Sequence, residues 1–510
     1  MNLHDLWAIP LTRRPDAVAL DFSTGDGERS TLTYRALFAA AGHLAGRLAE
    51  RGVGRGDRVA LHLGNRPETA VAYLAALRMG AVAVPVNLAY REPEIAHLLA
   101  DAEPSLALTE ADRRAEMDEA ARVAGVAVVT AEEMVSLDGE EPPGDRPPLA
   151  GSDLALLLYT SGTTGRSKGA MLTHDNLLAT VTGLLAAWQW SEDDRLLLTL
   201  PIFHTHGLVV GLFTALAAGA RVLLRPRFDA TAVADAVTGE AAGDTPSPTL
   251  FFGVPTMYVR LADELARRRD AGEPHAAPGM RLFASGSAPL APETFELMRQ
   301  LTGHEILERY GMTETGMNLS NLYAGPRRPG TVGVPLPGVS ARIVGDDGEV
   351  LAAGSEGELQ VAGGNVFAGY WRAPEKTAES FVTDAAGKRW FRTGDLARRD
   401  PESGYHTLLG RRTELILSGG YNVYPREVEE TILGWPGVRE AAVAGLPDRD
   451  LGEAVAAWVV VDGELDEEAV GAFLAERLAR YKLPRRWFVV DGLPRNALGK
   501  VQKGRLTGRG

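Results

Sequence analysis

One stretch of the chain gathers side chains that could hold a polyphosphate, namely Tyr159-Thr-Ser-Gly-Thr-Thr-Gly-Arg-Ser-Lys-Gly169. It contains three glycines, five serine or threonine hydroxyls and two cations. Glycine lets backbone N–H groups turn toward one point, hydroxyls add donors, and cations neutralise negative charge. The apolar run Leu154–Leu158 before it predicts a buried strand, and the segment from Leu172 predicts a capped helix start. Between such flanks we predict a phosphate-binding loop rather than a plain surface loop, with a spacing unlike that of the P-loop.

Composition bounds the class of protein. The chain has 510 residues, 45% of them hydrophobic, which is enough for several domain cores. It has no cysteine, which excludes disulfides, thiolate metal sites and a cysteine nucleophile. The formal net charge of −14 argues against a nucleic-acid partner and requires local cations wherever an anion binds. The N-terminus has no signal-peptide pattern and no apolar run approaches the ~20 residues of a membrane span, so we expect a cytoplasmic protein without a membrane partner.

Periodicity predicts an α/β fold. Residues 31–86 read as helix, strand, helix and strand, with the second helix at Arg66–Met79. Strands that alternate with helices predict parallel sheets covered on both faces. Residues 110–150 are charged and then rich in proline and glycine, so we predict an exposed connection there.

A compact unit of about a hundred residues follows Gly410, a common size for a domain. We predict helices at Pro425–Leu433 and Glu467–Leu478, and strands at Glu440–Ala444, Ala454–Val461 and Arg486–Val490. The predicted organisation is a large N-terminal domain of layered α/β sheets (1–410), a hinge (411–414) and a small mobile C-terminal α+β domain (415–510).

The predicted phosphate loop closely resembles that of the adenylate-forming superfamily, which includes acyl-CoA synthetases, adenylation domains of nonribosomal peptide synthesis and luciferases. Five further segments between His204 and Lys500 match that superfamily in its expected order. The resemblance covers nearly the whole chain and implies an acyl-CoA synthetase-like fold. It also implies a two-step ligase that uses ATP, Mg²⁺ and coenzyme A. An acid and ATP form an acyl-adenylate with release of pyrophosphate, and the thiol of CoA then attacks.

By this resemblance the catalytic residues are Lys500, His204, Thr160 and Glu314. Lys500 would stabilise negative charge between the attacking carboxylate and the α-phosphate, and Glu314 would hold Mg²⁺ bound to phosphate oxygens. Tyr310 would stack on adenine, and Asp395 would accept hydrogen bonds from the ribose hydroxyls. The full predicted nucleotide set is Thr160, Ser161, Gly162, Thr163, Thr164, Gly165, Lys168, Gly286, Ser287, Ala288, Arg309, Tyr310, Gly311, Met312, Thr313, Asp395 and Arg411.

Arg411 matches the arginine that marks the superfamily's hinge. Two residues later the superfamily usually has Asp or Lys, whereas this chain has Thr413, which puts a charge-based switch in doubt. Ser418, Gly419 and Gly420 resemble the loop that lines a narrow pantetheine tunnel in CoA-dependent members.

The acid is predicted to bind at Phe203-His-Thr-His-Gly207, where His204 and His206 would flank its carboxylate and Thr205 would form a small wall of the pocket. A metal at the two histidines is disfavoured because no third ligand is evident. The motifs together look most like those of malonyl-CoA synthetases. Malonate keeps a second carboxylate that needs a cation when buried, and the candidates are Arg309, Arg281 and Arg260. Met312 and Met317 would limit the length of the pocket.

Other functions stay open at this point. Within the superfamily these are a CoA ligase for a short or fatty monocarboxylate and a free-standing amino-acid adenylation enzyme. Outside catalysis, a nucleotide-binding protein that retains the fold is the alternative, although Lys500, Glu314 and Asp395 together argue against it. The sequence does not fix the oligomeric state, and a homo-oligomer is one possibility.

Overall fold

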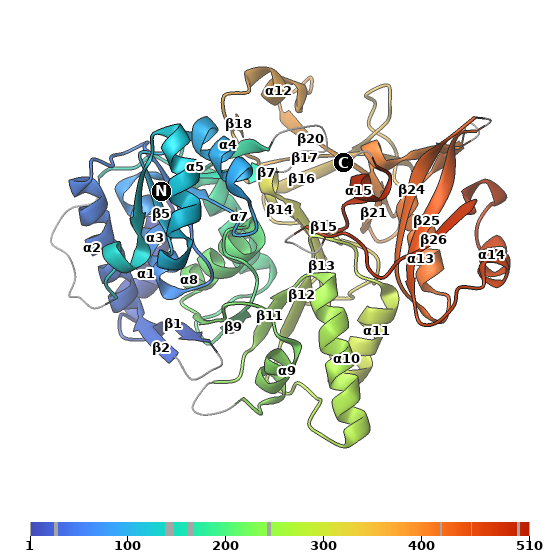
Figure 1. Ribbon diagram of the computed structural model, residues 1–510, viewed down its shortest axis with the longest axis horizontal. Helices are drawn as coiled ribbons and strands as arrows, with labels where there is room; N and C mark the ends of the chain where they lie inside the picture. Colours follow the sequence, from blue (N-terminus) through green and yellow to red (C-terminus); the bar gives the residue numbers. More distant parts are fainter. Residues whose placement is uncertain are drawn as a thin grey trace.

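Two large β-sheets with helices between and around them make up most of the chain (Figure 1). The structure is a computed structural model, and it describes residues 2–24, 29–137, 147–160, 167–241, 246–418, 421–449, 451–496 and 500–508. The helices before residue 411 are α1 (Leu3–Arg13), α2 (Tyr34–Glu50), α3 (Pro67–Met79), α4 (Glu92–Ala102), α5 (Arg114–Ala124), α6 (Ala131–Met134), α7 (His174–Ala187), α8 (Thr214–Ala218), α9 (Ala230–Thr238), α10 (Pro255–Ala271), α11 (Pro292–Thr302) and α12 (Pro374–Glu379).

The first large sheet has seven strands in the order β18 (Gly369–Tyr370), β8 (Lys168–Thr173), β7 (Leu154–Thr160), β4 (Val82–Pro85), β3 (Arg58–His62), β5 (Leu106–Thr109) and β6 (Ala127–Thr130). The strands from β7 to β6 are parallel. Alternate residues of these strands pack in two separate cores, one shared with α2 and α3 and the other with α4 and α5. A parallel sheet covered on both faces is therefore confirmed.

The second large sheet has nine strands in the order β15 (Val334–Pro335), β14 (Gly316–Ser320), β13 (Leu307–Met312), β12 (Leu282–Ser285), β11 (Leu250–Gly253), β9 (Arg195–Leu198), β10 (Arg221–Leu224), β1 (Val18–Ser23) and β2 (Arg29–Thr33). Its middle strands, β13 through β1, are parallel. The helices α9, α10 and α11 cover one face. On the other face, residues of α7 and α8 join the core that is shared with the first sheet.

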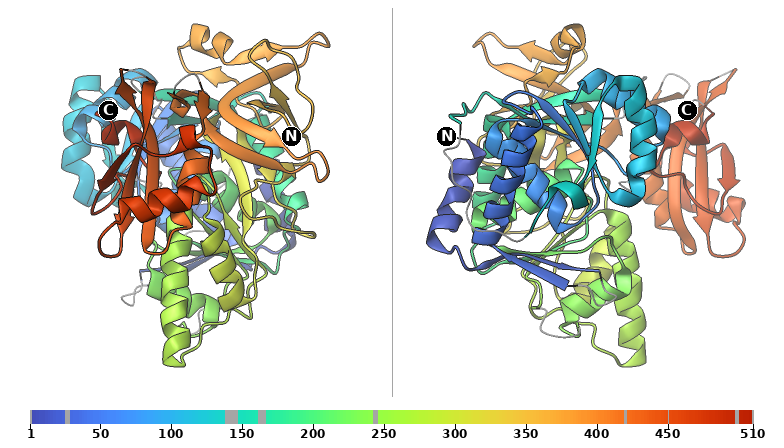
Figure 2. Two further views of the ribbon diagram at one scale, coloured as in Figure 1. Left: turned by 90° about the vertical axis from the view of Figure 1, so that its right-hand side faces the viewer. Right: turned by 60° about the vertical axis from the view of Figure 1, so that its left-hand side comes forward.

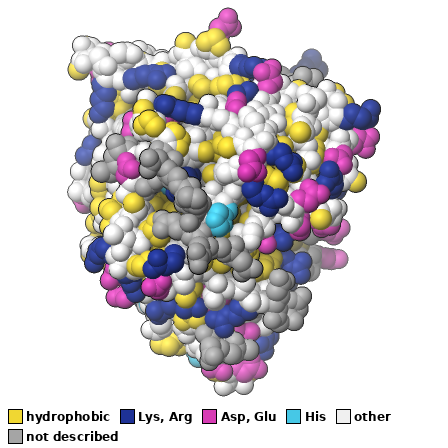
Figure 3. All heavy atoms as spheres, turned by 90° about the vertical axis from the view of Figure 1, so that its left-hand side faces the viewer, with side chains coloured by type: hydrophobic (Ala, Val, Ile, Leu, Met, Phe, Trp, Pro, Cys, Tyr) yellow, Lys and Arg dark blue, Asp and Glu magenta, His cyan; other side chains and the backbone are white. Residues whose placement is uncertain are grey.

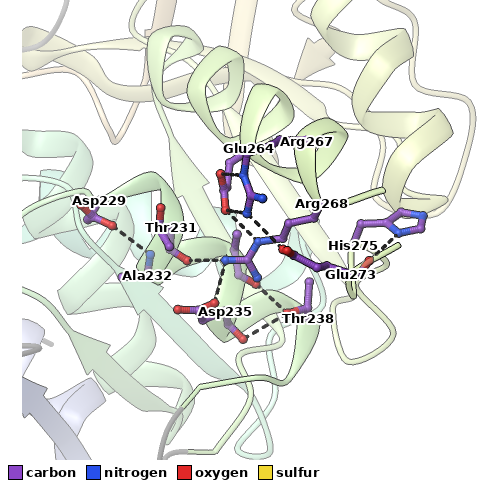
Figure 4. A network of polar contacts seen from close by, with 11 residues as sticks. Asp229, Thr231, Ala232, Asp235, Thr238, Glu264, Arg267, Arg268, Glu273 and His275 are labelled. Carbon is purple, nitrogen blue, oxygen red and sulfur yellow. Dashed lines mark hydrogen bonds and ion pairs between the residues drawn. The ribbon is translucent and has the colours of Figure 1, made fainter. Parts of the chain in front are cut away.

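An ion-pair network fastens α10 to α9 (Figure 4). Arg268 is buried, donates from Nε to Glu264 at 2.8 Å, and donates from Nη2 to Asp235 at 2.7 Å. Its Nη2 also reaches the carbonyl oxygen of Thr231 at 3.3 Å. This guanidinium thus has carboxylates and a carbonyl around it, which is the usual condition for burying a charge.

Two smaller sheets complete the chain. An antiparallel sheet contains β16 (Val339–Val344), β17 (Glu356–Gly363), β20 (Arg389–Arg399), β19 (Phe381–Thr383) and β21 (His406–Arg411). The last sheet contains β23 (Tyr421–Val423), β22 (Ile416–Ser418), β25 (Gly452–Val461), β24 (Val438–Asp448) and β26 (Arg486–Val489). With α13 (Pro425–Leu433), α14 (Glu467–Ala475) and α15 (Lys503–Leu506) it forms the unit at the right of Figure 1, which the right view of Figure 2 also sets apart from the rest.

The predicted fold class, a large α/β part followed by a small α+β part, is confirmed. The predicted helix Pro425–Leu433 coincides with α13. The hinge at 411–414 stays a prediction, although the last strand of the large part ends at Arg411 and a 3₁₀ turn, Arg412–Glu414, follows it.

One local prediction is wrong. Residues 110–150 are not merely a connection, because α5, the edge strand β6 and α6 all lie there. The predicted capped helix start in the segment from Leu172 is confirmed, because α7 begins at His174 and Thr173 caps it. The strand β8 before it was not predicted. It pairs antiparallel with β7, with Thr160 opposite Lys168.

The charges on the surface and the hydropathy of the helices agree with what the composition indicated. On the face shown in Figure 3, cationic and anionic side chains are interspersed among the residues drawn in colour. Among the described residues, no helix has both the length and the apolar character needed to cross a bilayer.

Candidate active site

A group of buried polar side chains without partners marks the predicted acyl pocket. Six atoms in it have no hydrogen-bond partner among the described residues: His204 Nε2, Thr205 Oγ1, His206 Nε2, Ser285 Oγ, Arg309 Nε and Arg309 Nη2. We call these five residues the unpartnered cluster. Leaving one buried donor or acceptor unpaired costs about 1–3 kcal/mol, so several in one place indicate groups that are kept for a ligand.

Three segments of the chain bring the cluster together. Ser285 ends β12, Arg309 lies on the neighbouring strand β13, and His206 begins a π-helix, His206–Phe213. Turns of π-helix are uncommon in proteins, and those that do occur often lie at functional sites. Gly207 is required at this turn, because a Cβ there would lie 2.3 Å from the carbonyl oxygen of Pro201.

Contacts connect Arg309 to the histidines. A Cβ on Gly286 would lie 2.5 Å from Arg309 Cζ, so the guanidinium packs directly on this glycine. The next residue, Ser287, has a left-handed backbone (φ 72°), and its Oγ lies 3.3 Å from His206 Nδ1. If Ser287 donates to Nδ1, the Nε2 atom of His206 carries the proton and is a donor toward the pocket.

Burial determines which residues of the unpartnered cluster are neutral at pH 7. Desolvation lowers the pKa of His204 to about 4 and places the pKa of His206 well below its ordinary value, with the positive charge of Arg309 adding to the effect on His206. Both imidazoles are therefore neutral at pH 7. Burial also lowers the pKa of Arg309, yet a guanidinium remains protonated near neutrality. The cluster thus holds one buried cation, Arg309, for which no carboxylate partner is found among the described residues.

His204 and Thr205 also line a small pocket beside the predicted phosphate loop. Thr313 and the end of β7, Leu158 and Tyr159, form other parts of its wall. The acyl segment and the strand that enters the loop therefore lie next to each other. Ser161, Gly162, Thr163, Thr164 and Gly165 fall outside the described residues, while Thr160 and Lys168 hold the two ends of the loop opposite each other.

A second polar group forms around Asp395. The hydroxyl of Tyr310 donates to Asp395 Oδ2, and Arg411 Nε contacts Asp395 Oδ1 at 2.8 Å. Arg411 Nη1 also donates to the carbonyl oxygen of Thr393 at 2.9 Å. Burial raises the pKa of Asp395, and the charge of Arg411 opposes that rise. Of the predicted nucleotide residues, Tyr310, Asp395 and Arg411 are thus brought into direct contact.

Glu314 is the predicted magnesium ligand. It is buried, Tyr370 donates a hydrogen bond to its Oε1 at 3.0 Å, and burial raises its pKa. Mg²⁺ is usually held by one or two carboxylates together with phosphate oxygens and water, so a single buried carboxylate beside the predicted phosphate loop fits that ion. Among the described residues, no three His, Asp or Glu side chains group as a metal site of their own.

Lys500 approaches the Asp395 group from the C-terminal unit. It is exposed, and its pKa is lowered by partial desolvation and by the charge of Arg411, while Glu414 and Asp395 oppose the shift. Its backbone N–H donates to Asn496 Oδ1 at 3.0 Å. Three residues later, Lys503 Nζ lies 2.7 Å from Glu429 and 3.4 Å from Glu414, which fastens the tail to α13 and to the predicted hinge.

Several predicted residues have other surroundings than expected. Arg281 is wrong as a partner of the free carboxylate, because its Nε and Nη2 are both 2.6 Å from Asp194 and its Nη1 donates to the carbonyl oxygen of Trp188. Arg260 is exposed near the start of α10. Ser287 directs its hydroxyl at His206, and the place of its backbone beside adenine stays a prediction.

The two methionines differ. Met317 is buried in the main core, while Met312 lies near the hydroxyl of Tyr310, with its sulfur 3.7 Å away. Ser418 is buried at the end of β22, and Gly419 and Gly420 lie outside the described residues. For Gly311 a Cβ would lie 2.1 Å from the carbonyl oxygen of Gly316, so only glycine fits this turn of the predicted nucleotide motif.

Sequence reasoning missed two residues of the site. These are Ser285, which directly precedes the predicted Gly286, and Tyr370. Tyr370 is 56 residues from Glu314 in the chain, so no local pattern could have paired them.

Comparisons with known proteins agree with this geometry. Residues 8–371 match the AMP-binding enzyme family, and residues 427–500 match the AMP-binding enzyme C-terminal domain. The chain is 36% identical to a malonate–CoA ligase of Arabidopsis thaliana over 482 residues, which cover 89% of this chain and 78% of that protein. It is 37% identical to a sulfoacetate–CoA ligase of Cupriavidus necator, covering 93% and 92%, and 37% identical to a feruloyl-CoA synthase of an Amycolatopsis species, covering 94% of each.

Solved structures are also similar. The ATP-bound form of MatB from Rhodopseudomonas palustris matches with a TM-score of 0.90 and 41% identity, covering 100% of this chain and 99% of that one. Its apo form matches over the same shares with a TM-score of 0.79 and 40% identity. Over the same shares of the two chains, the TM-score is thus higher for the ATP-bound form than for the apo form.

Proposed function

The chain belongs to the AMP-binding enzyme family, in which it is an adenylate-forming CoA ligase, and from this premise we propose that its acid is malonate. The overall reaction is then malonate, ATP and CoA to malonyl-CoA, AMP and pyrophosphate. The coarser activity, an acid–thiol ligase, does not depend on which acid is used.

The observation that carries the choice of acid is the buried guanidinium of Arg309. Its Nε and Nη2 have no partner among the described residues, and an isolated buried charge is costly. A substrate with a second negative group supplies the missing partner, and an arginine fork matches a carboxylate with two parallel hydrogen bonds. A monocarboxylate would leave Arg309 unpaired once its own carboxylate was placed at the phosphate loop. The neutral His206 adds a donor on the same side.

The first step joins the acid to the nucleotide. One carboxylate oxygen of malonate attacks the α-phosphorus of ATP, the bond to the β-phosphate oxygen breaks, and pyrophosphate leaves with that electron pair. Lys500 stabilises the negative charge that develops, and His204 and Thr160 border the reacting carboxylate. Glu314 would hold Mg²⁺, which supplies charge neutralisation on the phosphates. Tyr310, Asp395 and Arg411 orient the nucleoside.

In the second step, the sulfur of CoA attacks the acyl carbonyl, the bond to the phosphate oxygen breaks, AMP leaves, and the thiol proton passes to solvent. Ser418, Gly419 and Gly420 are proposed to border the pantetheine arm. The hinge at 411–414 and the mobile domain from 415 are part of this proposal.

Sulfoacetate is the second candidate acid. It also carries two negative groups, a sulfonate and a carboxylate, so the pairing argument for Arg309 applies to it. The similarity to a sulfoacetate–CoA ligase supports keeping it. Ferulate has no second charge to pair with Arg309, so the same argument disfavours it.

The test is thioester formation with malonate, sulfoacetate, acetate and ferulate under identical conditions. We expect malonate to give the highest kcat/KM. A higher value for sulfoacetate would transfer the proposal to that acid, and a higher value for acetate or ferulate would contradict the role of Arg309.

A second experiment tests Lys500. The variant Lys500→Ala, assayed by acid-dependent exchange of pyrophosphate into ATP, should lose the first step and keep thioester formation from supplied acyl-adenylate.

A further inference from the structure

One arginine of the C-terminal unit is buried against the large N-terminal part. Arg426 is the second residue of α13, and only 6% of its surface is exposed. Its Nη1 donates to the carbonyl oxygen of Leu408 on β21 at 2.8 Å, and its Nη2 lies 3.4 Å from the carbonyl oxygen of Gly330. Within its own helix, Nε pairs with Glu430 at 2.6 Å. The guanidinium thus spans the boundary between the two parts of the chain.

Gly330, which contacts Arg426 from the large part of the chain, also contacts a residue next to the candidate site. The backbone N–H of Gly330, whose carbonyl faces Arg426, donates to Glu308 Oε1 at 2.8 Å. Glu308 is buried on β13 immediately before Arg309. Burial raises the pKa of Glu308 to about 7, and among the groups that oppose this rise the charge of Arg426 comes first, ahead of the backbone donors at Gly330 and Leu290, while Glu430 adds to it. A cation from one part therefore stabilises a buried carboxylate of the other.

We propose that Arg426 and Glu308 form an interdomain latch that holds the C-terminal unit in the arrangement needed for adenylation. In this arrangement Lys500 lies close enough to Asp395 and Arg411 to interact with their charges, and the chain matches the ATP-bound form of MatB with a higher TM-score than the apo form, 0.90 against 0.79. Rotation of the unit for the thioester step has to withdraw Arg426 from Leu408 and Gly330. Arg426 is a positioning residue, since it acts through the placement of Lys500. The latch rests on the two-step activity but not on the identity of the acid.

The same boundary offers a matched control. Arg426 and Arg398 line one cavity between the two parts of the chain. The ion pair of Arg398 is with Glu356, at 3.7 Å, so both partners belong to the large part, and both are exposed to solvent. Replacing Arg398 removes a cation from this cavity without removing a contact across the boundary among those described.

The first experiment separates the two half-reactions, using whichever acid the wild-type protein turns over. Acid-dependent pyrophosphate exchange reports adenylation, and thioester formation from supplied acyl-adenylate and CoA reports the second step. We expect Arg426→Gln to lower exchange about tenfold, as for loss of one charge-assisted contact, and to leave the second step within about twofold of wild type. Arg426→Lys should restore part of the exchange, and Arg398→Gln should match wild type.

A double-mutant cycle tests the partner. If Glu308 is stabilised by Arg426, the effects of Glu308→Gln and Arg426→Gln on exchange should not add, and the double variant should be no worse than Arg426→Gln alone. Equal loss of both half-reactions in Arg426→Gln, or fully additive effects, would overturn the latch.

A distance measurement between the two parts of the chain tests the latch independently of enzymatic activity. Because the chain has no cysteine, Val123→Cys on α5 and Val489→Cys on β26, both well exposed, place two spin labels on the two parts. Without ligand, Arg426→Gln should shift the label distances away from the wild-type distribution, whereas Arg398→Gln should not. Identical distributions in all three proteins would refute the latch. Absence of exchange by wild type with every acid would contradict the proposed function instead, and the distances would still test the latch.

Discussion

Two buried arginines of this chain differ in what surrounds them. Arg268, between α9 and α10, is 5% exposed and has Glu264, Asp235 and the Thr231 carbonyl as partners (Figure 4). Arg309, on β13, is 4% exposed, and its Nε and Nη2 have no partner among the described residues. Burial alone would lower the pKa of Arg268, yet its two carboxylates outweigh burial and raise it, whereas burial lowers the pKa of Arg309.

The difference separates an arginine that stabilises the fold from one that is available to a ligand. A buried ion pair that is complete holds two helices together, and breaking it costs stability. A buried guanidinium that is incomplete costs stability in the free protein and gains its partner on binding. Substitution at the two positions should therefore have opposite consequences.

The largest effect is expected at Arg309. Arg309→Gln should lower kcat/KM for malonate about a hundredfold or more, because loss of one partner of a buried charge pair costs about 3 kcal/mol. The value for a monocarboxylate should change far less. Unfolding by denaturant should show no loss of stability, because an unpaired buried charge has been removed. Equal losses for both acids would contradict the assignment.

Arg268→Gln should do the reverse. It leaves Glu264 and Asp235 without their cation, and we expect the free energy of unfolding to fall by about 3 kcal/mol. Values of kcat/KM for malonate, measured well below the melting temperature, should match wild type. A selective change in KM for malonate would remove the distinction between the two arginines.

Gly286→Ala should produce an intermediate effect on binding. The new Cβ would lie within 2.7 Å of Arg309 Nε, Cζ and Nη1, so the guanidinium has to move. We expect KM for malonate to rise about tenfold, equivalent to about 1.4 kcal/mol, with a smaller rise for a monocarboxylate. Gly46→Ala, at a helical glycine with open space around its Cβ, is the matched control and should leave both KM values unchanged.

The smallest effect concerns His204, a neutral histidine of the unpartnered cluster. The pKa of His204 is lowered to about 4, from 6.5, so the unfolded chain takes up a proton before the folded one does. Its contribution to stability is therefore present above pH 6.5 and is lost as the pH falls from about 6.5 toward 4. Between pH 7 and 5, His204→Gln should lose less unfolding free energy than wild type. The same loss in both proteins would indicate that folding does not lower the pKa of His204.

The sequence was informative where chemistry and periodicity are local. The helix Arg66–Met79 and the helix Pro425–Leu433 were predicted almost to the residue, since each has a proline at or next to its start and a glycine after its end. The strand β8 was missed because Lys168-Gly-Ala-Met-Leu-Thr173 lacks a clear alternation of apolar and polar residues, and its pairing with β7 is a property of the hairpin.

Long-range partners were out of reach. Arg281 looked available because its own segment borders the site, but Asp194, 87 residues away, occupies its guanidinium. The isolation of Arg309 was equally hidden, since it depends on β12, the π-helix and Gly286. A sequence shows that an arginine is present, whereas only the fold shows whether it is already paired.

The helix α13 has attachments on two sides. Arg426, near its start, touches the large part of the chain, and Glu429, one turn later, holds Lys503 of the tail that carries Lys500. The two contacts lie one helical turn apart on α13, so a movement of this helix relative to the large part of the chain also moves the tail. Loss of the ion pair between Glu429 and Lys503 would release the tail from α13 and uncouple Lys500 from this movement.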